Sequence, residues 1–102
     1  MNQYQKLSVS SAPGVNGSWT TAMVPAVQQY SDGNLNLSIS GTWVGTVTIQ
    51  RKFQDEDDYF DVDTFTANVE TFITEFEHGV AYRLGMKNLE YTSGTVNLRL
   101  SR

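Results

Sequence analysis

Residues 34–53 have the sequence NLNLSISGTWVGTVTIQRKF, and this stretch decides the fold. Apolar and polar residues alternate strictly over residues 35–39, and the alternation resumes over residues 46–53 with Val47, Ile49, Arg51 and Phe53 on one face. Neighbouring side chains of a β-strand point to opposite faces, so this alternation predicts two strands that each bury one face. Gly41 and Gly45 lie between them and predict a corner or a β-bulge. The stretch therefore indicates antiparallel β-structure.

The same signals continue on both sides of this stretch. Clean alternation recurs over residues 80–86 and 96–100. Residues 20–28 suit an edge strand, because Pro25 cannot donate a hydrogen bond within a central strand. Residues 67–76 could form a helix, but their threonine and valine content favours strands. Further short strands are expected at residues 59–62, 65–67 and 69–76. About eight strands predict an all-β fold, a single antiparallel β-sandwich of the jelly-roll or immunoglobulin-like type.

The segments between these strands carry turn signals. Turns are expected at residues 31–34, 54–58, 77–79 and 90–94. Residues 1–18 are rich in Ser, Asn, Gln and Gly, and their apolar residues are isolated. Such a segment cannot bury enough surface to order itself. We therefore expect an extended N-terminal arm at residues 1–18, either frayed or ordered against a neighbouring subunit, and a sandwich domain at residues 19–102.

Length and composition exclude several classes of protein. The 102 residues suit one domain. A net charge of −4 with seven lysines and arginines argues against nucleic-acid binding and against anionic membranes. No apolar run approaches the roughly 20 residues of a membrane-spanning helix, and the first residues lack the apolar stretch of a secretory signal. The absence of cysteine excludes disulfides and thiolate sites, so folding in a cytoplasm is the simplest expectation.

Residues that could carry catalysis or hold a metal are sparse. Asp55, Asp57 and Asp58 could offer oxygen ligands to calcium, but their spacing does not match a calcium-binding loop, and a solvated hairpin tip is favoured. His78 is the single histidine, and the chain has neither a serine-nucleophile elbow nor a phosphate-binding glycine loop. We therefore expect a protein without enzyme activity, catalytic residues or a cofactor.

Five aromatic residues fall in or beside the expected turns: Trp19, Tyr30, Trp43, Tyr59 and Tyr91. Aromatic rings at loop ends can stack on sugars or anchor a protein interface, so these five are the candidate contact residues. For Trp43 the alternative of plugging one end of the core is favoured. Arg51 and Arg83 lie in or beside apolar strand faces. Each is expected to pair with an Asp or Glu across the sheet, or else to mark an interface.

Three short motifs follow one another along the chain: residues 40–51, SGTWVGTVTIQR, residues 79–84, GVAYRL, and residues 93–100, SGTVNLRL. In this order they resemble small virion proteins of tailed bacteriophages. The corresponding segments of that family read Ser-Gly-Thr-x-x-Gly-Thr-Val-Thr-x-Gln-Arg, Gly-Val-x-Tyr-Arg-Leu and Ser-Gly-Thr-Val-x-Val-Arg-Leu. The hairpin between them departs from the family's Ser-Phe-Asp-Gly-Gly-x-x-Trp pattern. Here Glu56-Asp57 replace the glycine pair, and Phe60 stands near the position of the Trp.

This resemblance implies a structural role in a virion assembled in the bacterial cytoplasm. It implies a non-enzymatic decoration or cement protein that binds the major capsid protein, or another virion protein, across capsomers. It also implies a homo-oligomer, with a trimer favoured, because symmetry multiplies weak contacts. The alternatives are a neck or tail accessory protein, and a virion-borne carbohydrate-binding or adhesion module whose ligand would be a glycan.

Overall fold

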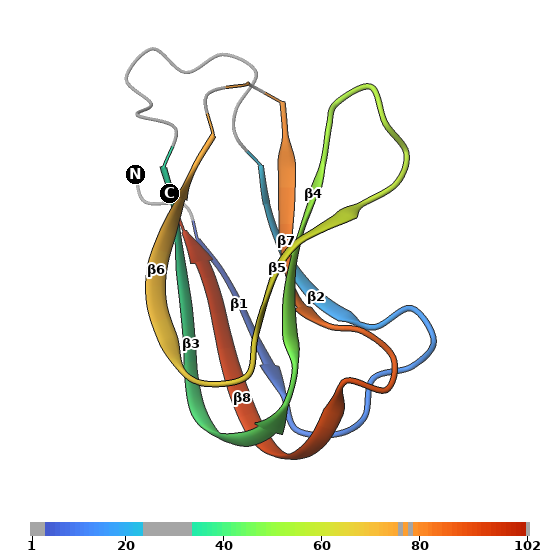
Figure 1. Cartoon of the computed structure of the whole chain (residues 1–102), viewed down its shortest axis with the longest axis vertical. Helices are drawn as coiled ribbons and strands as arrows, with labels where there is room; N and C mark the ends of the chain where they lie inside the picture. The colour runs from blue at the N-terminus through green and yellow to red at the C-terminus, as the bar shows by residue number, and fades with distance from the viewer. Residues whose placement is uncertain (1–3, 24–33, 76, 78, 102) are drawn as a thin grey trace.

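The computed structural model describes residues 4–23, 34–75, 77 and 79–101. All regular structure within these ranges is β-strand, which confirms the predicted all-β fold class. The strands are β1 (Tyr4–Val9), β2 (Ser18–Met23), β3 (Asn34–Gly45), β4 (Val47–Lys52), β5 (Phe60–Phe65), β6 (Val69–Thr74), β7 (Ala81–Met86) and β8 (Tyr91–Ser101), arranged as Figure 1 shows. In these ranges no helix is long and apolar enough to cross a membrane.

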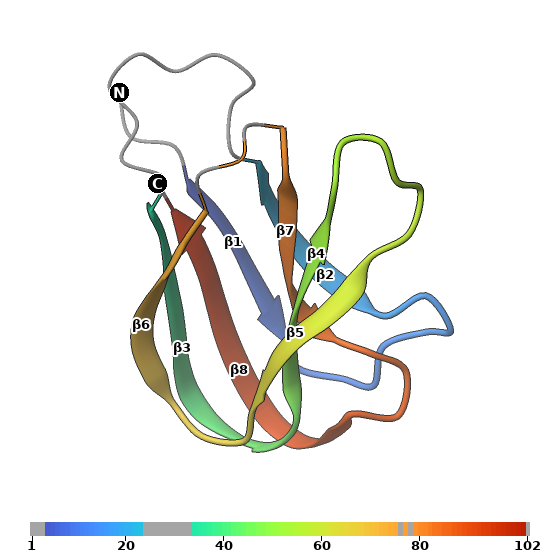
Figure 2. The same cartoon turned by 45° about the horizontal axis from the view of Figure 1, so that its top comes forward.

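The strands form two antiparallel sheets of four strands each. Sheet A has the order β1-β8-β3-β6, and sheet B has the order β2-β7-β4-β5. β1 pairs with β8, β2 with β7, β3 with β6 and β4 with β5, so the first half of the chain pairs with the second half in reverse order. A long hairpin that rolls up on itself produces this nesting, which is the topology of a jelly roll. The strand order therefore selects the jelly roll over the immunoglobulin-like arrangement, and Figure 2 shows its two layers.

The core lies between the inner faces of the two sheets. Alternate apolar side chains of the central strands β3, β4, β7 and β8 are buried there. They are Leu35, Leu37, Ile39, Val47, Ile49, Tyr82, Leu84, Met86, Val96, Leu98 and Leu100. Burying one side chain of this kind stabilises a fold by roughly 1.5–3 kcal/mol. The four strands predicted from clean alternation are thus confirmed, with ends shifted by a few residues.

The glycine-flanked segment is part of one long strand. The register of β3 against β8 shifts between Val44 and Gly45, so the expected bulge is present. On the opposite strand, Gly94 pairs with Trp43 and has a φ of +86°. A Cβ on Gly94 would collide with the carbonyl oxygen of Thr42. The close approach of β8 to β3 therefore requires glycine at this position.

Two predictions differ from the structure. The expectation of an arm is wrong for residues 4–9, which form β1, pair with β8 and bury Val9 in the core. Pairing of the backbone with a central strand supplies the order that the segment's few apolar residues do not indicate. The turn expected at residues 90–94 lies earlier, because the Glu90 N–H donates to the Lys87 carbonyl at 3.1 Å and β8 begins at Tyr91.

The remaining assignments concern shorter segments. The described part of segment 67–76 contains the strand β6 and no helix. The separate strand expected at residues 65–67 is wrong, because Phe65 is the last residue of β5 and residues 66–67 form a bend. β2 confirms the first part of the strand expected at residues 20–28. The rest of that strand, most of the turn at 31–34, and His78 lie outside the described residues.

Candidate binding surfaces

Trp19, Arg83 and Tyr59 form a stack on the outer face of sheet B, named here the Arg83 stack. The guanidinium carbon of Arg83 lies 4.1 Å from the centroid of the Trp19 ring and 4.1 Å from that of the Tyr59 ring. Aromatic rings attract a cation over their faces, and the attraction grows as the cation loses water. Two of the five candidate aromatic residues are thus brought together by an arginine.

The register of sheet B explains how these residues meet. Arg83 on β7 pairs with Thr21 of β2 on one side and with Gln50 of β4 on the other. Trp19 of β2 pairs with Gly85, and a side chain at Gly85 would collide with the backbone of β2. Glycine therefore lets β2 lie close to β7, so that the indole of Trp19 can reach Arg83.

A chain of hydrogen bonds runs across the strands from Arg83. Its Nε donates to Oε1 of Gln50 at 2.7 Å, and Nε2 of Gln50 donates to Oδ1 of Asp61 at 2.7 Å. Nζ of Lys87 donates to the other oxygen of Asp61 at 2.6 Å. These two bonds, that from Lys87 most strongly, lower the pKa of Asp61 from its ordinary value. Gln50 is buried with both ends of its amide bonded, so the chain fixes the position of Arg83.

Arg83 has no carboxylate partner among the residues that the structure describes. Burial lowers the pKa of Arg83, and the neighbouring Tyr59 acts in the opposite direction. Removing water from a charged group is costly unless another group compensates the charge. The stack therefore offers a rigid, partly desolvated cation to an anionic group from outside.

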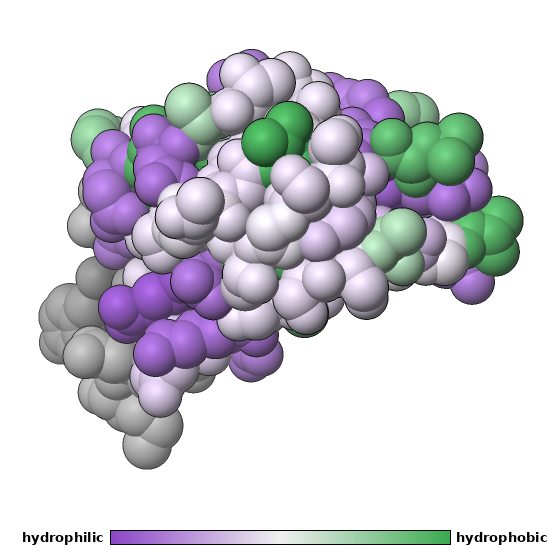
Figure 3. Space-filling view, turned by 90° about the horizontal axis from the view of Figure 1, so that it is seen from below, coloured by the Kyte–Doolittle hydropathy of each residue, from purple (hydrophilic) through white to green (hydrophobic). Residues whose placement is uncertain are grey.

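A shallow depression of about 460 Å³ lies beside the stack, lined by Trp19, Arg83, Lys87 and Asn88 among others. The exposed Val15 of the β1–β2 loop also lines it, and the exposed Leu89 follows Asn88 in the β7–β8 turn. Figure 3 shows apolar groups on the right-hand side of the molecule, the side on which Figure 1 places both loops. The outer face of sheet B thus combines a charged centre with apolar neighbours.

Trp43 and Tyr91 have structural roles. Trp43 packs against the core, and its Nε1 donates to Oδ1 of Asn68 at 2.8 Å. This is the core-plugging alternative that the sequence left open. The hydroxyl of Tyr91 lies 2.9 Å from the Ser10 carbonyl oxygen and 2.7 Å from that of Gly94, and so ties the β1–β2 loop to β8. The fifth candidate, Tyr30, lies outside the described residues.

Arg51 meets the expected carboxylate partner. Its Nη1 lies 3.4 Å from Oε1 of Glu75, and the hydroxyl of Tyr82 donates to the same oxygen at 2.8 Å. Burial, followed by the bond to Glu75, raises the pKa of Tyr82 to about 12. This group closes one end of the core. Arg83 differs from Arg51, because its cross-strand partner is the neutral amide of Gln50.

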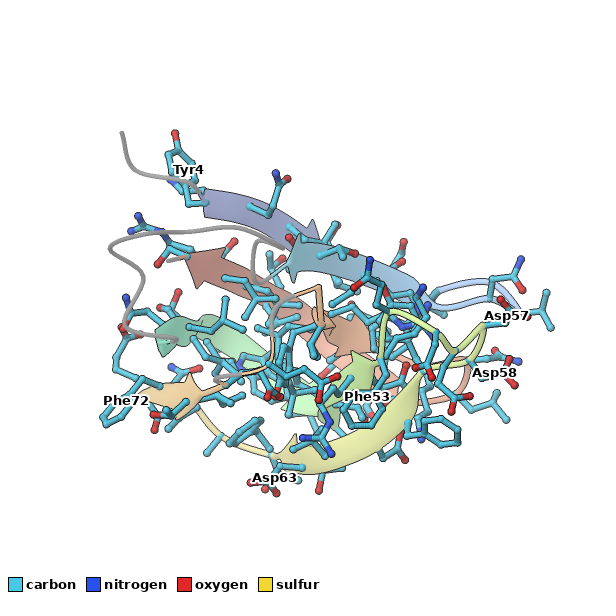
Figure 4. The ribbon with its side chains drawn as sticks, turned by 90° about the horizontal axis from the view of Figure 1, so that it is seen from above. Tyr4, Phe53, Asp57, Asp58, Asp63 and Phe72 are labelled. Carbon is cyan, nitrogen blue, oxygen red and sulfur yellow. The ribbon has the colours of Figure 1, made fainter. Side chains whose placement is uncertain are left out.

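The acidic hairpin is exposed. Figure 4 shows Asp57 and Asp58 at its tip and Asp63 well away from them on β5. The carboxylate of Asp63 accepts a bond from the N–H of Thr64 at 2.8 Å. Among the described residues, no three His, Cys, Asp or Glu side chains are grouped so that they could hold a metal ion.

The outer face of sheet A, named here the sheet A face, presents a regular array of polar side chains. The strand register aligns them in three rows: Tyr4–Ser101–Asn36–Phe72, Lys6–Arg99–Ser38–Glu70, and Ser8–Asn97–Ser40. Ser8 donates to Asn97 at 2.7 Å, and Ser38 donates to Glu70. Tyr4 and Phe72 stand at opposite edges of the sheet and point away from the core, as Figure 4 shows.

Sequence reasoning missed this second face. Its aromatic residues lie in the segment expected to be an arm and in the segment with a possible helix. The signal that could have found it is the row of polar residues between the buried ones in β3 and β8, such as Asn36, Ser38, Asn97 and Arg99. Alternation fixes the outward direction of these side chains, but only the strand order shows which of them are neighbours.

Comparison with known proteins adds no assignment. No protein-family model matches the chain, and no curated protein is significantly similar to it.

Proposed function

We propose that the chain is a non-enzymatic structural protein of a tailed-bacteriophage virion, which decorates or cements the head by binding across capsomers. The resemblance of residues 40–51, 79–84 and 93–100 to small virion proteins supports this proposal. Gln50 and Arg83 belong to two of these segments, and a 2.7 Å hydrogen bond joins them beside the stack. The motifs therefore include a cross-strand pair on an outer face, besides residues of the core.

The observation that carries the proposal is the environment of the Arg83 side chain, which is stacked between two aromatic rings. Trp, Tyr and Arg are the side chains that dominate the binding energy of protein interfaces. Here one of each is stacked, and the guanidinium is partly stripped of water without a carboxylate partner in the described chain. A carboxylate of a capsid protein would form a charge-assisted hydrogen bond with Arg83 and offset its desolvation.

The surroundings of the stack also suit a protein partner. Val15 and Leu89 are exposed on two loops, and Val15 lines the depression together with Lys87 and Asn88. Buried apolar contacts around a polar anchor are typical of protein interfaces. Attachment as a homo-oligomer, with a trimer favoured, would repeat the stack around a symmetry axis and multiply a weak contact.

The chemistry of this face favours binding over catalysis. Asp61 is the carboxylate nearest to Arg83 in the hydrogen-bonded chain, and it is held by Gln50 and Lys87. A general acid needs a pKa near the working pH, whereas the bond from Lys87 lowers the pKa of Asp61. Asp61 is therefore suited to orienting Gln50.

Locating the chain in the virion of the phage that encodes it tests the proposal. Virions are assembled with the wild-type chain, with Arg83→Ala, and with Arg99→Ala as a control arginine on the opposite sheet. Cryo-electron microscopy is expected to show wild-type density at repeated positions on the head. Arg83→Ala should reduce its occupancy about tenfold or more, and Arg99→Ala should not. Density at the neck or tail, or none on the particle, would overturn the decoration role. Full occupancy with Arg83→Ala would overturn the stack as the contact.

A further inference from the structure

The sheet A face carries two cations that face each other without an anion between them. Lys6 on β1 and Arg99 on β8 are direct cross-strand partners, and like charges directly opposite each other destabilise a sheet. The next carboxylate in the row, Glu70, lies two strands from Arg99 and accepts a bond from Ser38. No ion pair joins Lys6 or Arg99 to a carboxylate within the described residues. An anion from outside would relieve this repulsion.

The side chains of Lys6 and Arg99 both contact the ring of Tyr4. Nζ of Lys6 lies 5.4 Å, and the guanidinium carbon of Arg99 5.0 Å, from the centroid of Tyr4. The ring gathers the two charges on one part of the face. This concentration occurs although the chain as a whole has a net charge of −4. The positive charge is therefore a local feature of the sheet A face.

Two aromatic rings mark the ends of the row above these cations. Tyr4 is 52% exposed and Phe72 is 63% exposed. They lie three strand spacings apart, or about 14 Å. The two positions between them are Ser101 and Asn36, whose side chains are short and polar and line the same depression as Phe72. Exposed rings that flank a floor of hydroxyl and amide groups can stack on sugar rings while the floor bonds sugar hydroxyls.

The face is hollowed on both sides of Arg99. One depression of about 530 Å³ is lined by Asn36, Ser38, Glu70, Phe72 and Arg99 among others, and the Ser38 hydroxyl donates a hydrogen bond to the Glu70 carboxylate there. A second, of about 300 Å³, is lined by Lys6, Ser38, Asn97 and Arg99 among others. Arg99 and Ser38 belong to both. A ligand that reaches from one depression to the other would therefore pass directly over Arg99.

We propose that the sheet A face binds an oligosaccharide that carries carboxylate groups, such as a chain of uronic acids. A sugar carboxylate pairs with Arg99 and Lys6, and sugar rings stack on Phe72 and Tyr4. Two cations are few for a nucleic-acid backbone, whose binding requires the neutralisation of many phosphates. The spacing of the two rings and the polar floor favour a sugar chain over an acidic peptide. The site is independent of the proposed attachment through the Arg83 stack, because the two lie on opposite sheets.

The test is a titration of the full, isotope-labelled chain, in which binding is detected as changes in the amide chemical shifts. The probes are trigalacturonate, the same trimer with its carboxylates methyl-esterified, and tetraglutamate. Trigalacturonate is expected to give saturable shifts confined to β1, β8, β3 and β6. The methyl ester should bind about tenfold or more weakly, because it cannot form the charge-assisted bonds to Arg99 and Lys6. Equal binding of the ester, or shifts confined to sheet B, would overturn the proposal.

Variants locate the contacts. Arg99→Gln is expected to weaken trigalacturonate binding about tenfold or more, and Phe72→Ala about three- to tenfold. The matched control is Phe60→Ala, because Phe60 is 56% exposed and belongs to β5 of sheet B, and its affinity should equal that of the wild type. The spectrum of each free variant verifies that it is folded. Unchanged affinity with Arg99→Gln contradicts the site. Tighter binding of tetraglutamate than of trigalacturonate assigns the face to an acidic peptide instead.

Discussion

Arg83 and Gln50 face each other on β7 and β4, and Nε of Arg83 donates a 2.7 Å hydrogen bond to Oε1 of Gln50. The amide of Gln50 is the link between a cation and an anion, because its other end donates to Asp61. A glutamine is the side chain suited to this position, since it both accepts from the guanidinium and donates to the carboxylate. The outer face of sheet B is therefore organised around a neutral bridge between two charged groups.

Replacing the bridge should destabilise the protein. Gln50→Ala removes both hydrogen bonds and leaves Arg83 without its polar partner in the described chain. The free energy of unfolding is expected to fall by about 1–3 kcal/mol, as measured by urea denaturation. The control is Gln5→Ala in the exposed part of the edge strand β1, which should stay within about 0.5 kcal/mol of the wild type. Equal stability of the two variants would contradict the bridge.

A pair of glycine substitutions tests the close packing of β3 and β8. Gly94→Ala places a Cβ against the Thr42 carbonyl and forces alanine to a φ of +86°. We expect a loss of at least about 1–3 kcal/mol, which is the cost of strain at such a position. Gly14→Ala is the control, because nothing lies within 4 Å of its Cβ. Equal melting temperatures of the two variants in thermal denaturation would refute this account of the strand pairing.

The loss of stability at acidic pH should depend on Asp61. The hydrogen bond from Lys87, and then that from Gln50, lowers the pKa of Asp61 below its ordinary value of 3.8. A carboxyl group with a lowered pKa in the folded state contributes stability that is present above its unfolded pKa. That contribution is lost as the pH falls through the folded pKa. Asp61→Asn should therefore reduce stability at neutral pH and lose less on acidification than the wild type.

Urea denaturation measured from neutral pH to below about pH 3 checks this. Asp57→Asn is the comparison, because Asp57 is exposed at the tip of the hairpin (Figure 4). Its stability curve is expected to keep the shape of the wild-type curve. If Asp61→Asn and the wild type lost equal stability on acidification, the bonds from Lys87 and Gln50 would have no energetic effect.

The sequence predicted the central strands and, with shifted ends, the edge strands β2, β5 and β6, but it missed β1 for a physical reason. Leu35, Ile39, Val47 and Leu98 belong to strands with one fully buried face, and burial leaves a period of two in the sequence. β1 has little such signal, since it lies at the edge of sheet A and of its residues only Val9 is fully buried. Its order comes from pairing with β8, almost 90 residues away in the chain, which no local pattern records.

The candidate surfaces were predictable only in part. Trp19 and Tyr59 were found because aromatic rings beside turns can stack on sugars or anchor a protein interface. Their meeting over Arg83 depends on the order β2-β7-β4-β5, which places three distant segments together. The sheet A face has no apolar pattern at all, so its rows follow from register alone. The motifs that resemble virion proteins supply mostly core residues and tight glycine positions, such as Gly94. They therefore indicate the fold more directly than the partner.

The orientation of the chain on the head tests the central claim most directly. A cryo-electron microscopy map of the decorated capsid, resolved to side chains, shows which sheet faces the capsomers. The account predicts that Trp19, Arg83 and Tyr59 are buried in the interface, with a capsid carboxylate within about 4 Å of the Arg83 guanidinium. It also predicts that the sheet A face, with Tyr4 and Phe72, points outward. A map in which the outer face of sheet B is exposed to solvent would contradict the account.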